Sequence, residues 1–398
     1  MPHNRKRHLN SLLVETLKFS PIVGILGHRQ VGKTTLASEL ASSYFTLDLK
    51  QTQTKLDNDP IGFLESNRGS PLVIDECQLS PDLFPALKEF VRKNKKPGQF
   101  LITGSVRFTS RKAIKESLTG RIINWELLPM DYCELRDMPL SNTVIRFIEA
   151  KNIELEVKKP NADIASEIKR YLTQGGLPGI FAVRNEALRF QKLESQLEAL
   201  FDRDLRLILE TSLSLRTIVS FASYLAAHQG VPLNLSEASR ATRISIPTLR
   251  KLILAFEAIF LIRVYMTEGG QKAPIIYLED QGEATHLGSN KRSELQQIEH
   301  YVYANLRTQW LYRPHLKITL TQYRTRGGAL VPFVLRSPKG ILGMIPSLEE
   351  NPGPSAYGSG VSFLKANPGA KVLYLHLGKK DQIINKQERT LSVGSLVI

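Results

Sequence analysis

The stretch that most constrains this chain runs from Gly27 to Thr34 and reads Gly-His-Arg-Gln-Val-Gly-Lys-Thr. It matches the phosphate-binding pattern GxxxxGK[ST] at every fixed position. An apolar run, 21–26, precedes it, and a helix-forming run with leucines four residues apart, 34–41, follows it. These flanks predict strand, glycine-rich loop and helix in the order that the motif needs, and they disfavour the alternative of a glycine turn followed by a surface Lys-Thr pair.

The chemistry of phosphate binding explains each part of this motif. Glycines let the backbone turn its N–H groups toward phosphate oxygens, and the start of the following helix adds partial positive charge. Lys33 is predicted to reach the β- and γ-phosphates of a nucleoside triphosphate, and the Thr34 hydroxyl to hold Mg²⁺. The predicted nucleotide-binding residues are Gly27, His28, Arg29, Gln30, Val31, Gly32, Lys33, Thr34 and Thr35.

A second apolar run ends in two acids, Asp75 and Glu76. A strand in this position delivers its last residues to the carboxyl edge of a parallel sheet, beside the phosphates. Asp75 is predicted to hold Mg²⁺, directly or through water, and Glu76 to polarise the attacking water. Strands often end in turn-forming acids, so this signal gains its weight from the phosphate loop upstream.

Two further segments supply catalytic candidates. The run 99–105 predicts a buried strand that ends in hydroxyl residues, with Ser105 the preferred contact for the γ-phosphate and Thr103 the alternative. Arg121 opens a predicted strand over 122–128, and it is either a phosphate-contacting arginine, in cis or across a subunit interface, or an ordinary surface arginine. The predicted catalytic set is Glu76, Lys33, Ser105 and Arg121, with Thr34 and Asp75 as metal ligands.

Composition narrows the class of protein. With 398 residues, of which 42% are hydrophobic, the chain can bury a sizeable core in about two to three domains. The net charge of +15 favours anionic partners, or simply solvates the surface, and both interpretations stay open. Cys77 and Cys133 are the two cysteines, too few for a disulfide framework or a zinc site. Without an apolar run of about 18 residues, we expect a cytoplasmic protein with no membrane partner.

The middle of the chain reads as mostly helical. A strand is predicted at 44–49 and helices at 61–66 and 81–91; after a boundary near 131–160 come a helix at 163–173, a turn at 175–179 and a long helix or helix pair at 185–210. Asp202, Arg203 and Asp204 either couple to the nucleotide or a neighbour or form a solvated helix face, the commoner case.

The segments 235–242 and 246–256, followed by a strand at 260–265, predict a winged-helix pattern in which Ser245 caps the second helix. Thr248, Arg250 and Lys251 are candidates for DNA contact, although the same unit packs domains together in other proteins. Further on, a helix at 294–310 and strands at 317–323, 329–336, 340–345 and 371–377 predict a small α+β module, interrupted by a Gly/Pro/Ser-rich loop at 351–361.

The segments 27–36, 72–78, 101–105 and 118–129, with Gly-Gly-Leu-Pro at 175–178 and Arg-Asp-Leu at 203–205, together resemble the prokaryotic AAA+ ATPases whose ATPase domain is fused to a C-terminal domain of unknown function. The resemblance covers nearly the whole chain. His28 stands where that family usually has proline. The resemblance implies a sheet of the additional-strand class of P-loop NTPases, ATP as the nucleotide, and the nucleotide site named above.

In that family the last module resembles a restriction-endonuclease fold. Glu299 matches its helix acid, but Leu330 and Pro332 stand where the family usually has acids, and 343–347 lacks the acid-x-lysine. Because a Mg²⁺ nuclease needs carboxylate ligands, we predict a nuclease-dead scaffold or interaction domain.

These inferences predict an α/β chain of four consecutive parts: an AAA+-like ATP-binding domain at 1–135, a helical lid at 160–228, a winged-helix-like region at 229–268 and a degenerate nuclease-like α+β domain at 269–398. The expected function is Mg²⁺-dependent ATP hydrolysis with a regulatory or target-binding C-terminal half. The alternative is a DNA-binding or protein-interaction module that uses ATP as a slow switch. DNA, a protein partner and a second copy of the chain stay open as partners.

Overall fold

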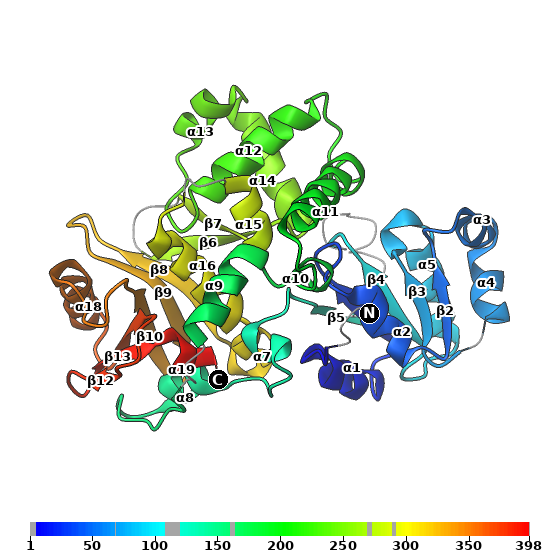
Figure 1. Cartoon of the computed structure of the whole chain (residues 1–398). Helices are drawn as coiled ribbons and strands as arrows, with labels where there is room; N and C mark the ends of the chain where they lie inside the picture. The colour runs from blue at the N-terminus through cyan, green and yellow to red at the C-terminus, as the bar shows by residue number, and fades with distance from the viewer. Residues whose placement is uncertain are drawn as a thin grey trace. The chain divides into compact units, whose positions relative to one another are not determined.

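The computed structural model describes residues 5–67, 69–107, 120–159, 164–268, 273–288 and 292–397. The chain forms two compact units, each built from separate stretches (Figure 1). The first unit contains Met1–Pro129, Leu177–Leu215 and Arg250–Leu261, and the second contains Met130–Gly176, Arg216–Leu249 and Ile262–Ile398. Four consecutive parts were predicted, and the structure instead has two interleaved units, because the chain returns to the first unit twice after leaving it.

The first unit is built on a five-stranded, all-parallel sheet. Its strands are β1 Ile22–Leu26, β2 Ser43–Thr46, β3 Leu72–Asp75, β4 Phe100–Gly104 and β5 Ile122–Glu126. Their order is β2-β3-β4-β1-β5, and every neighbouring pair is parallel. Strand β4 therefore lies between β1 and β3, which is the additional-strand arrangement that the resemblance implied. The three central strands are buried at every residue, as expected for strands covered on both faces.

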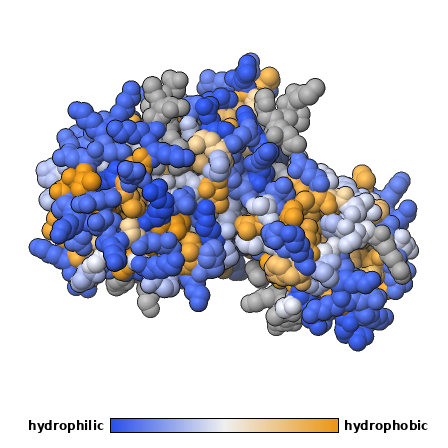
Figure 2. Space-filling view, turned by 90° about the horizontal axis from the view of Figure 1, so that it is seen from below, coloured by the Kyte–Doolittle hydropathy of each residue, from blue (hydrophilic) through white to orange (hydrophobic). Residues whose placement is uncertain are grey.

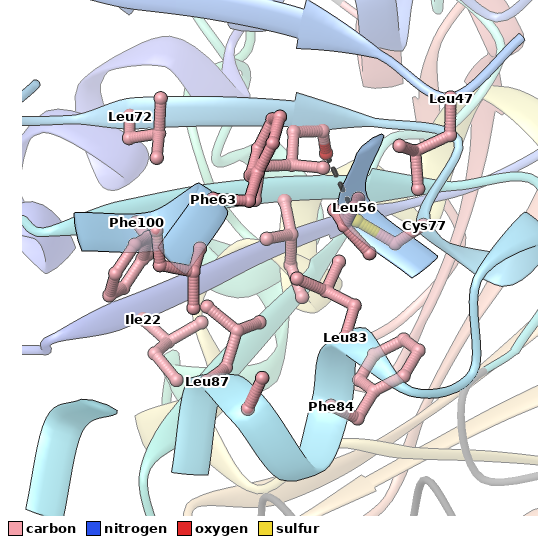
Figure 3. Packing of buried hydrophobic residues seen from close by; sticks show 14 of the residues in the cluster. Ile22, Leu47, Leu56, Phe63, Leu72, Cys77, Leu83, Phe84, Leu87 and Phe100 are labelled. Atoms are coloured by element: carbon pink, nitrogen blue, oxygen red, sulfur yellow. Dashed lines mark hydrogen bonds between the residues drawn. The ribbon is translucent and has the colours of Figure 1, made fainter. Parts of the chain in front are cut away.

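Helices connect and cover these strands. They are α1 Leu9–Leu17, α2 Lys33–Leu40, α3 Lys50–Asn58, α4 Pro60–Ser66, α5 Leu83–Lys93, α10 Pro178–Phe181, α11 Glu186–Ala199 with a π-helix at Leu200–Leu205, and α14 Ile246–Ala258, which joins this unit from Arg250 onward. Figure 3 shows Leu83 and Leu87 of α5 packed with Ile22 and Phe100 of the sheet, and all four are at most 2% exposed. Each such side chain stabilises the fold by about 1.5–3 kcal/mol.

The second unit contains a mixed eight-stranded sheet in the order β12-β13-β11-β10-β9-β8-β6-β7. Its strands are β6 Ile262–Glu268, β7 Pro274–Leu278, β8 Thr319–Arg324, β9 Leu330–Ser337, β10 Gly340–Pro346, β11 Lys371–His376, β12 Gln382–Ile383 and β13 Glu388–Ser392. Strand β6 pairs antiparallel with β7 and parallel with β8. The strand predicted to complete a winged helix is thus continuous with the sheet of the last module, across the boundary placed at 268/269.

The helices of the second unit confirm most of the predicted positions. They are α7 Tyr132–Leu135, α8 Thr143–Glu149, α9 Ile164–Gln174, α12 Leu215–Ala227, α13 Leu235–Thr242, α15 Gln281–Gly288, α16 Glu294–Leu306, α17 Thr308–Leu311, α18 Pro354–Ala366 and α19 Val393–Val397. The Ser245 cap of α14 is present, because its Oγ accepts a hydrogen bond from the Thr248 backbone N–H at 3.4 Å.

The loop predicted at 351–361 is wrong, because most of it forms α18. Pro354 occupies the first turn of that helix, where its missing N–H and fixed φ cost nothing. Gly360 lies on the face toward β11, and a Cβ at this position would be 2.0 Å from the Tyr374 hydroxyl. The glycine that suggested a loop instead allows the helix to approach the sheet closely.

Figure 2 shows one face of the molecule, on which hydrophilic side chains predominate and apolar ones form smaller groups. Large apolar side chains that are well exposed include Phe19, Leu188 and Leu254. Among the helices that the structure describes, none is long and apolar enough to cross a membrane.

Candidate functional site

The loop at 27–34 joins β1 to α2, as the sequence predicted. Its backbone takes positive φ at Gly27 (154°), Gln30 (60°) and Gly32 (101°). A Cβ on Gly27 would lie 2.4 Å from the Leu127 carbonyl oxygen, so glycine is required there by space as well as by conformation. From outside the loop, the Arg7 guanidinium donates hydrogen bonds to the carbonyls of Val31 (2.6 Å) and Leu128 (2.5 Å).

Lys33 opens α2 and is buried inside the loop, with only 4% of its surface exposed. Its Nζ donates hydrogen bonds to the carbonyl oxygens of Gly27 (3.0 Å) and His28 (2.8 Å). Burial lowers the pKa of this ammonium group, and the nearby carboxylates of Glu76 and Asp75 act in the opposite direction. The loop backbone thus holds the lysine, and His28 contributes its carbonyl oxygen to this contact.

Asp75 ends β3, and its buried carboxylate accepts hydrogen bonds from three hydroxyl groups. Oδ2 accepts hydrogen bonds from Thr34 Oγ1 at 2.8 Å and from the Tyr44 hydroxyl at 2.7 Å, while Oδ1 accepts one from Thr103 Oγ1. These donors come from α2, β2 and β4. Burial, together with the hydrogen bond to Asp75, raises the pKa of the Tyr44 phenol. The two predicted metal ligands, Thr34 and Asp75, are therefore neighbours.

Glu76 follows β3 in the left-handed conformation, with φ at 58°. Its backbone N–H donates to Thr103 Oγ1 at 3.1 Å, and its half-buried carboxylate accepts hydrogen bonds from Gln78 Nε2 and, at 3.4 Å, from Ser105 Oγ. Gln78 Nε2 also bonds Ser105 Oγ at 2.9 Å. The preferred residue, Ser105, thus contacts Glu76, and its alternative, Thr103, contacts Asp75.

Arg121 is the predicted catalytic residue that the structure places elsewhere. Strands β1 and β5 run parallel with Ile22 opposite Ile122 and Leu26 opposite Glu126. The phosphate loop follows Leu26, whereas Arg121 precedes Ile122. The two therefore lie at opposite ends of the parallel strands, about 16 Å apart along the strand direction. A contact with phosphate in cis is therefore wrong. The contact across a subunit interface stays a prediction, and Leu118 and Thr119 of the same motif lie outside the described residues.

The segment 202–204 also differs from its preferred interpretation as a solvated face. Asp204 is fully buried and forms an ion pair with Arg29 of the loop, with 3.1 Å between Arg29 Nη1 and Asp204 Oδ1. Arg203 pairs with Asp48, which follows β2. Asp204 is therefore not part of a solvated face, and coupling of 202–204 to the nucleotide or a neighbour stays a prediction.

Sequence reasoning gave no role to Gln78 or Tyr44. Gln78 carried a usable signal, because it closely follows a strand predicted to point its carboxyl end at the phosphate loop. Gln78 is a 2%-exposed polar residue two positions after Glu76, and Tyr44 belongs to a strand parallel to the one that ends in Asp75. The buried Gln78 needs a partner, which is Glu76, and the more exposed Tyr44 donates its hydroxyl hydrogen bond to Asp75.

The loop, the strand order and the two acids define a P-loop domain of the AAA-like class. Two family models match parts of the chain: residues 19–136 match a family described as an AAA domain, and residues 165–293 match a domain of unknown function, DUF8612. The first match supports an ATP-binding, AAA-like function for the first unit. The second gives no activity for the residues that it covers.

Individual relatives add no described function. Two uncharacterized proteins, one from Mycobacterium bovis and one from Mycobacterium tuberculosis, are each 26% identical over 287 residues. The match covers 70% of this chain and 58% of each relative, so the chain spans less than two thirds of their length.

Two solved structures show a distant likeness. One is a Walker-type ATPase of Pyrococcus abyssi (16% identity, TM-score 0.42), covering 70% of this chain and 94% of that one. The other is a signal transduction ATPase with numerous domains and a tetratricopeptide repeat sensor, from Pyrococcus horikoshii (12% identity, TM-score 0.29), covering 77% and 46%. At these TM-scores, neither structure indicates a function for this chain.

Proposed function

We propose that this chain binds ATP with Mg²⁺ at the loop 27–34 and hydrolyses it. The observation that carries the proposal is the 2.8 Å contact between Thr34 Oγ1 and Asp75 Oδ2. This contact brings a hydroxyl and a carboxylate together as neighbouring oxygen ligands, the type that Mg²⁺ prefers. Both therefore fit the ion. When bound, Mg²⁺ neutralises negative charge on the phosphates.

Lys33 supplies the protein's own positive charge. In the structure its ammonium group is held by two neutral carbonyl oxygens. Hydrogen bonds from an ammonium group to phosphate are stronger than those to neutral carbonyls, because both partners are charged. We infer that Lys33 exchanges these carbonyls for phosphate oxygens and stabilises the charge that develops in the transition state.

Glu76 is the group that orients the attacking water, and Ser105 is the contact for the γ-phosphate. Glu76 is half-buried and lies beside Ser105, so one side chain can serve the water while the other serves the phosphate. Gln78 supports both, since its amide touches each of them.

For the C-terminal half of the chain we propose a regulatory or target-binding role, with a protein partner or a second copy of the chain as candidates. DNA is a further candidate partner through the proposed winged-helix region, because Arg250 and Lys251 are exposed on α14. If DNA or another target is the main ligand, the chain uses ATP as a slow switch. The effect of DNA on ATP turnover separates these two functions.

The experiment compares ATP binding and Mg²⁺-dependent hydrolysis in the wild type and two variants. We expect Glu76→Gln to bind ATP but to lose turnover by about 100-fold, as for loss of a general base, and Lys33→Ala to lose binding. Glu39→Gln and Lys88→Ala remove the same charges from exposed positions of the first unit and are expected to behave as wild type. If the wild type binds ATP without turning it over, with or without DNA, the proposed hydrolysis is refuted. The chain would then use ATP as a slow switch.

A further inference from the structure

We propose that Asp204 is a positioning residue for the nucleotide loop, acting through Arg29, so that the helical segment 186–205 responds to the bound nucleotide. The inference rests on the proposed ATP binding. It concerns Arg29 of the loop and Asp204, to which the proposed binding and hydrolysis of ATP give no role.

Arg29 and Asp204 form an ion pair between the loop and the helical segment. Arg29 Nη1 lies 3.1 Å from Oδ1 and 3.3 Å from Oδ2 of Asp204. The Asp204 side chain is fully buried, whereas 22% of the Arg29 side chain is exposed. A buried carboxylate is costly without a paired cation, so Asp204 favours the loop conformation that presents Arg29 to it. The same two residues act on Lys33, because Asp204 raises and Arg29 lowers the pKa of its ammonium group.

Two ion pairs place the segment on the sheet. Asp204 pairs with Arg29, which follows β1, and the adjacent Arg203 pairs with Asp48, which follows β2. In the order β2-β3-β4-β1, these anchors stand on either side of β3 and β4, the strands that carry the two acids and the two hydroxyls. The segment therefore crosses the carboxyl edge of the sheet, where the nucleotide site lies. The pKa of Arg203 is raised mainly by its hydrogen bond to Asp48, with smaller effects from Asp204 and Glu76.

Buried side chains hold the segment that carries Arg203 and Asp204 in place. The anchor residues lie in the π-helix Leu200–Leu205, which continues α11. Leu200, Phe201 and Leu205 are fully buried, and the Phe201 ring packs on Phe256 at 5.7 Å between centroids. Single π-turns inside helices are rare and are frequent at functional sites. These side chains hold the segment in place. A movement of Arg29 when the loop binds phosphate therefore also changes the stability of the segment, through the ion pair with Asp204.

The test measures the affinity for ADP and for a non-hydrolysable ATP analogue, together with amide hydrogen exchange in 186–205. In the wild type we expect the ATP analogue to slow exchange in this segment. Asp204→Asn and Arg29→Met are each expected to weaken analogue binding about ten-fold and to remove the slowing, and the double variant to be no worse than either single one. The matched control is Asp202→Asn, which removes an exposed carboxylate from the same π-helix.

Folding is controlled by Arg29→Met/Asp204→Leu, because replacing a buried ion pair by apolar side chains usually preserves the fold. This variant is expected to melt as wild type while showing the weakened binding and the lost protection. Unchanged affinity in this folded variant would overturn the inference. So would a loss of affinity in the double variant that equals the sum of the losses in the two single variants. A wild type that binds no nucleotide would overturn the proposed function itself, so the two failures are distinguishable.

Discussion

The second unit should lose stability as the pH rises, because of Glu299 on α16. Burial raises the pKa of this carboxyl to about 7, from an ordinary value of 4.5. A Cβ added to Gly230 would lie 3.0 Å from Glu299 Oε2 and 2.8 Å from the Tyr277 hydroxyl, so both groups lie close to Gly230. Within the described part of the chain, Glu299 has neither a hydrogen bond nor an ion pair.

The sign and size follow from proton linkage. Between pH 4.5 and 7 the folded state keeps a proton on Glu299 that the unfolded chain has lost, so the free energy of unfolding falls as the pH rises through this range. The folded-state pKa of about 7 and the ordinary value of 4.5 differ by about 2.5 units. At 1.36 kcal/mol per unit, the change between pH 4.5 and 8 is up to about 3 kcal/mol. Glu299→Gln removes this contribution and no other titration.

The assay is urea unfolding of wild type and Glu299→Gln at pH 5, 6, 7 and 8. We expect the stability of the variant relative to wild type to increase by about 2–3 kcal/mol from pH 5 to pH 8. Glu294→Gln, on the exposed side of the same helix, is the control and should follow the wild type. A constant difference between wild type and Glu299→Gln across this range would refute the reasoning.

Three further substitutions test the packing of α18 and the position of Arg121. Gly360→Ala should destabilise the second unit by about 1–3 kcal/mol, because its Cβ would meet the Tyr374 hydroxyl at 2.0 Å. Gly358→Ala, in the same helix with no atom within 4 Å of the added Cβ, should instead stabilise by about 0.5–1 kcal/mol; equal unfolding midpoints would contradict both expectations. Arg121→Ala should leave ATP turnover unchanged in dilute, monomeric protein, since Arg121 lies at the far edge of the sheet. A loss of turnover that appears only at high protein concentration would support a contact across subunits.

Local pattern predicted the three central strands of the first unit, because each is short, apolar and followed by residues of the predicted nucleotide site. The same reasoning missed β13, Glu388–Ser392, since its sequence is polar although every residue is buried. Specific partners make this possible: the Tyr374 hydroxyl donates to Glu388 Oε1 at 2.6 Å, and Arg389 donates to the Leu155 carbonyl at 2.6 Å. Such partners come from distant parts of the chain, and hydrophobic periodicity contains no signal for them.

Asp204 shows the same limit within the candidate site. A charged residue on a helix is usually solvated, so the sequence alone favoured exposure. Its burial depends on Arg29, 175 residues away, and on a π-turn that local propensity does not indicate. The division into units was unpredictable for a related reason. Helix α9 follows the first unit in sequence but packs in the second, where the Tyr171 and Tyr301 rings meet edge to face at 5.3 Å.

The arrangement of the two acids depends on one backbone conformation that the sequence does not reveal. Adjacent residues of a regular strand point to opposite faces, so Asp75 and Glu76 would diverge if β3 continued. Glu76 instead takes a φ of 58°, which is strained for a residue other than glycine, and its N–H is held by Thr103 Oγ1 at 3.1 Å. Thr103 and Ser105, two residues apart at the end of β4, then reach Asp75 and Glu76 respectively. The turn at Glu76 therefore lets one strand end supply a hydroxyl to each acid, which places the proposed metal ligand and the proposed water-orienting group side by side.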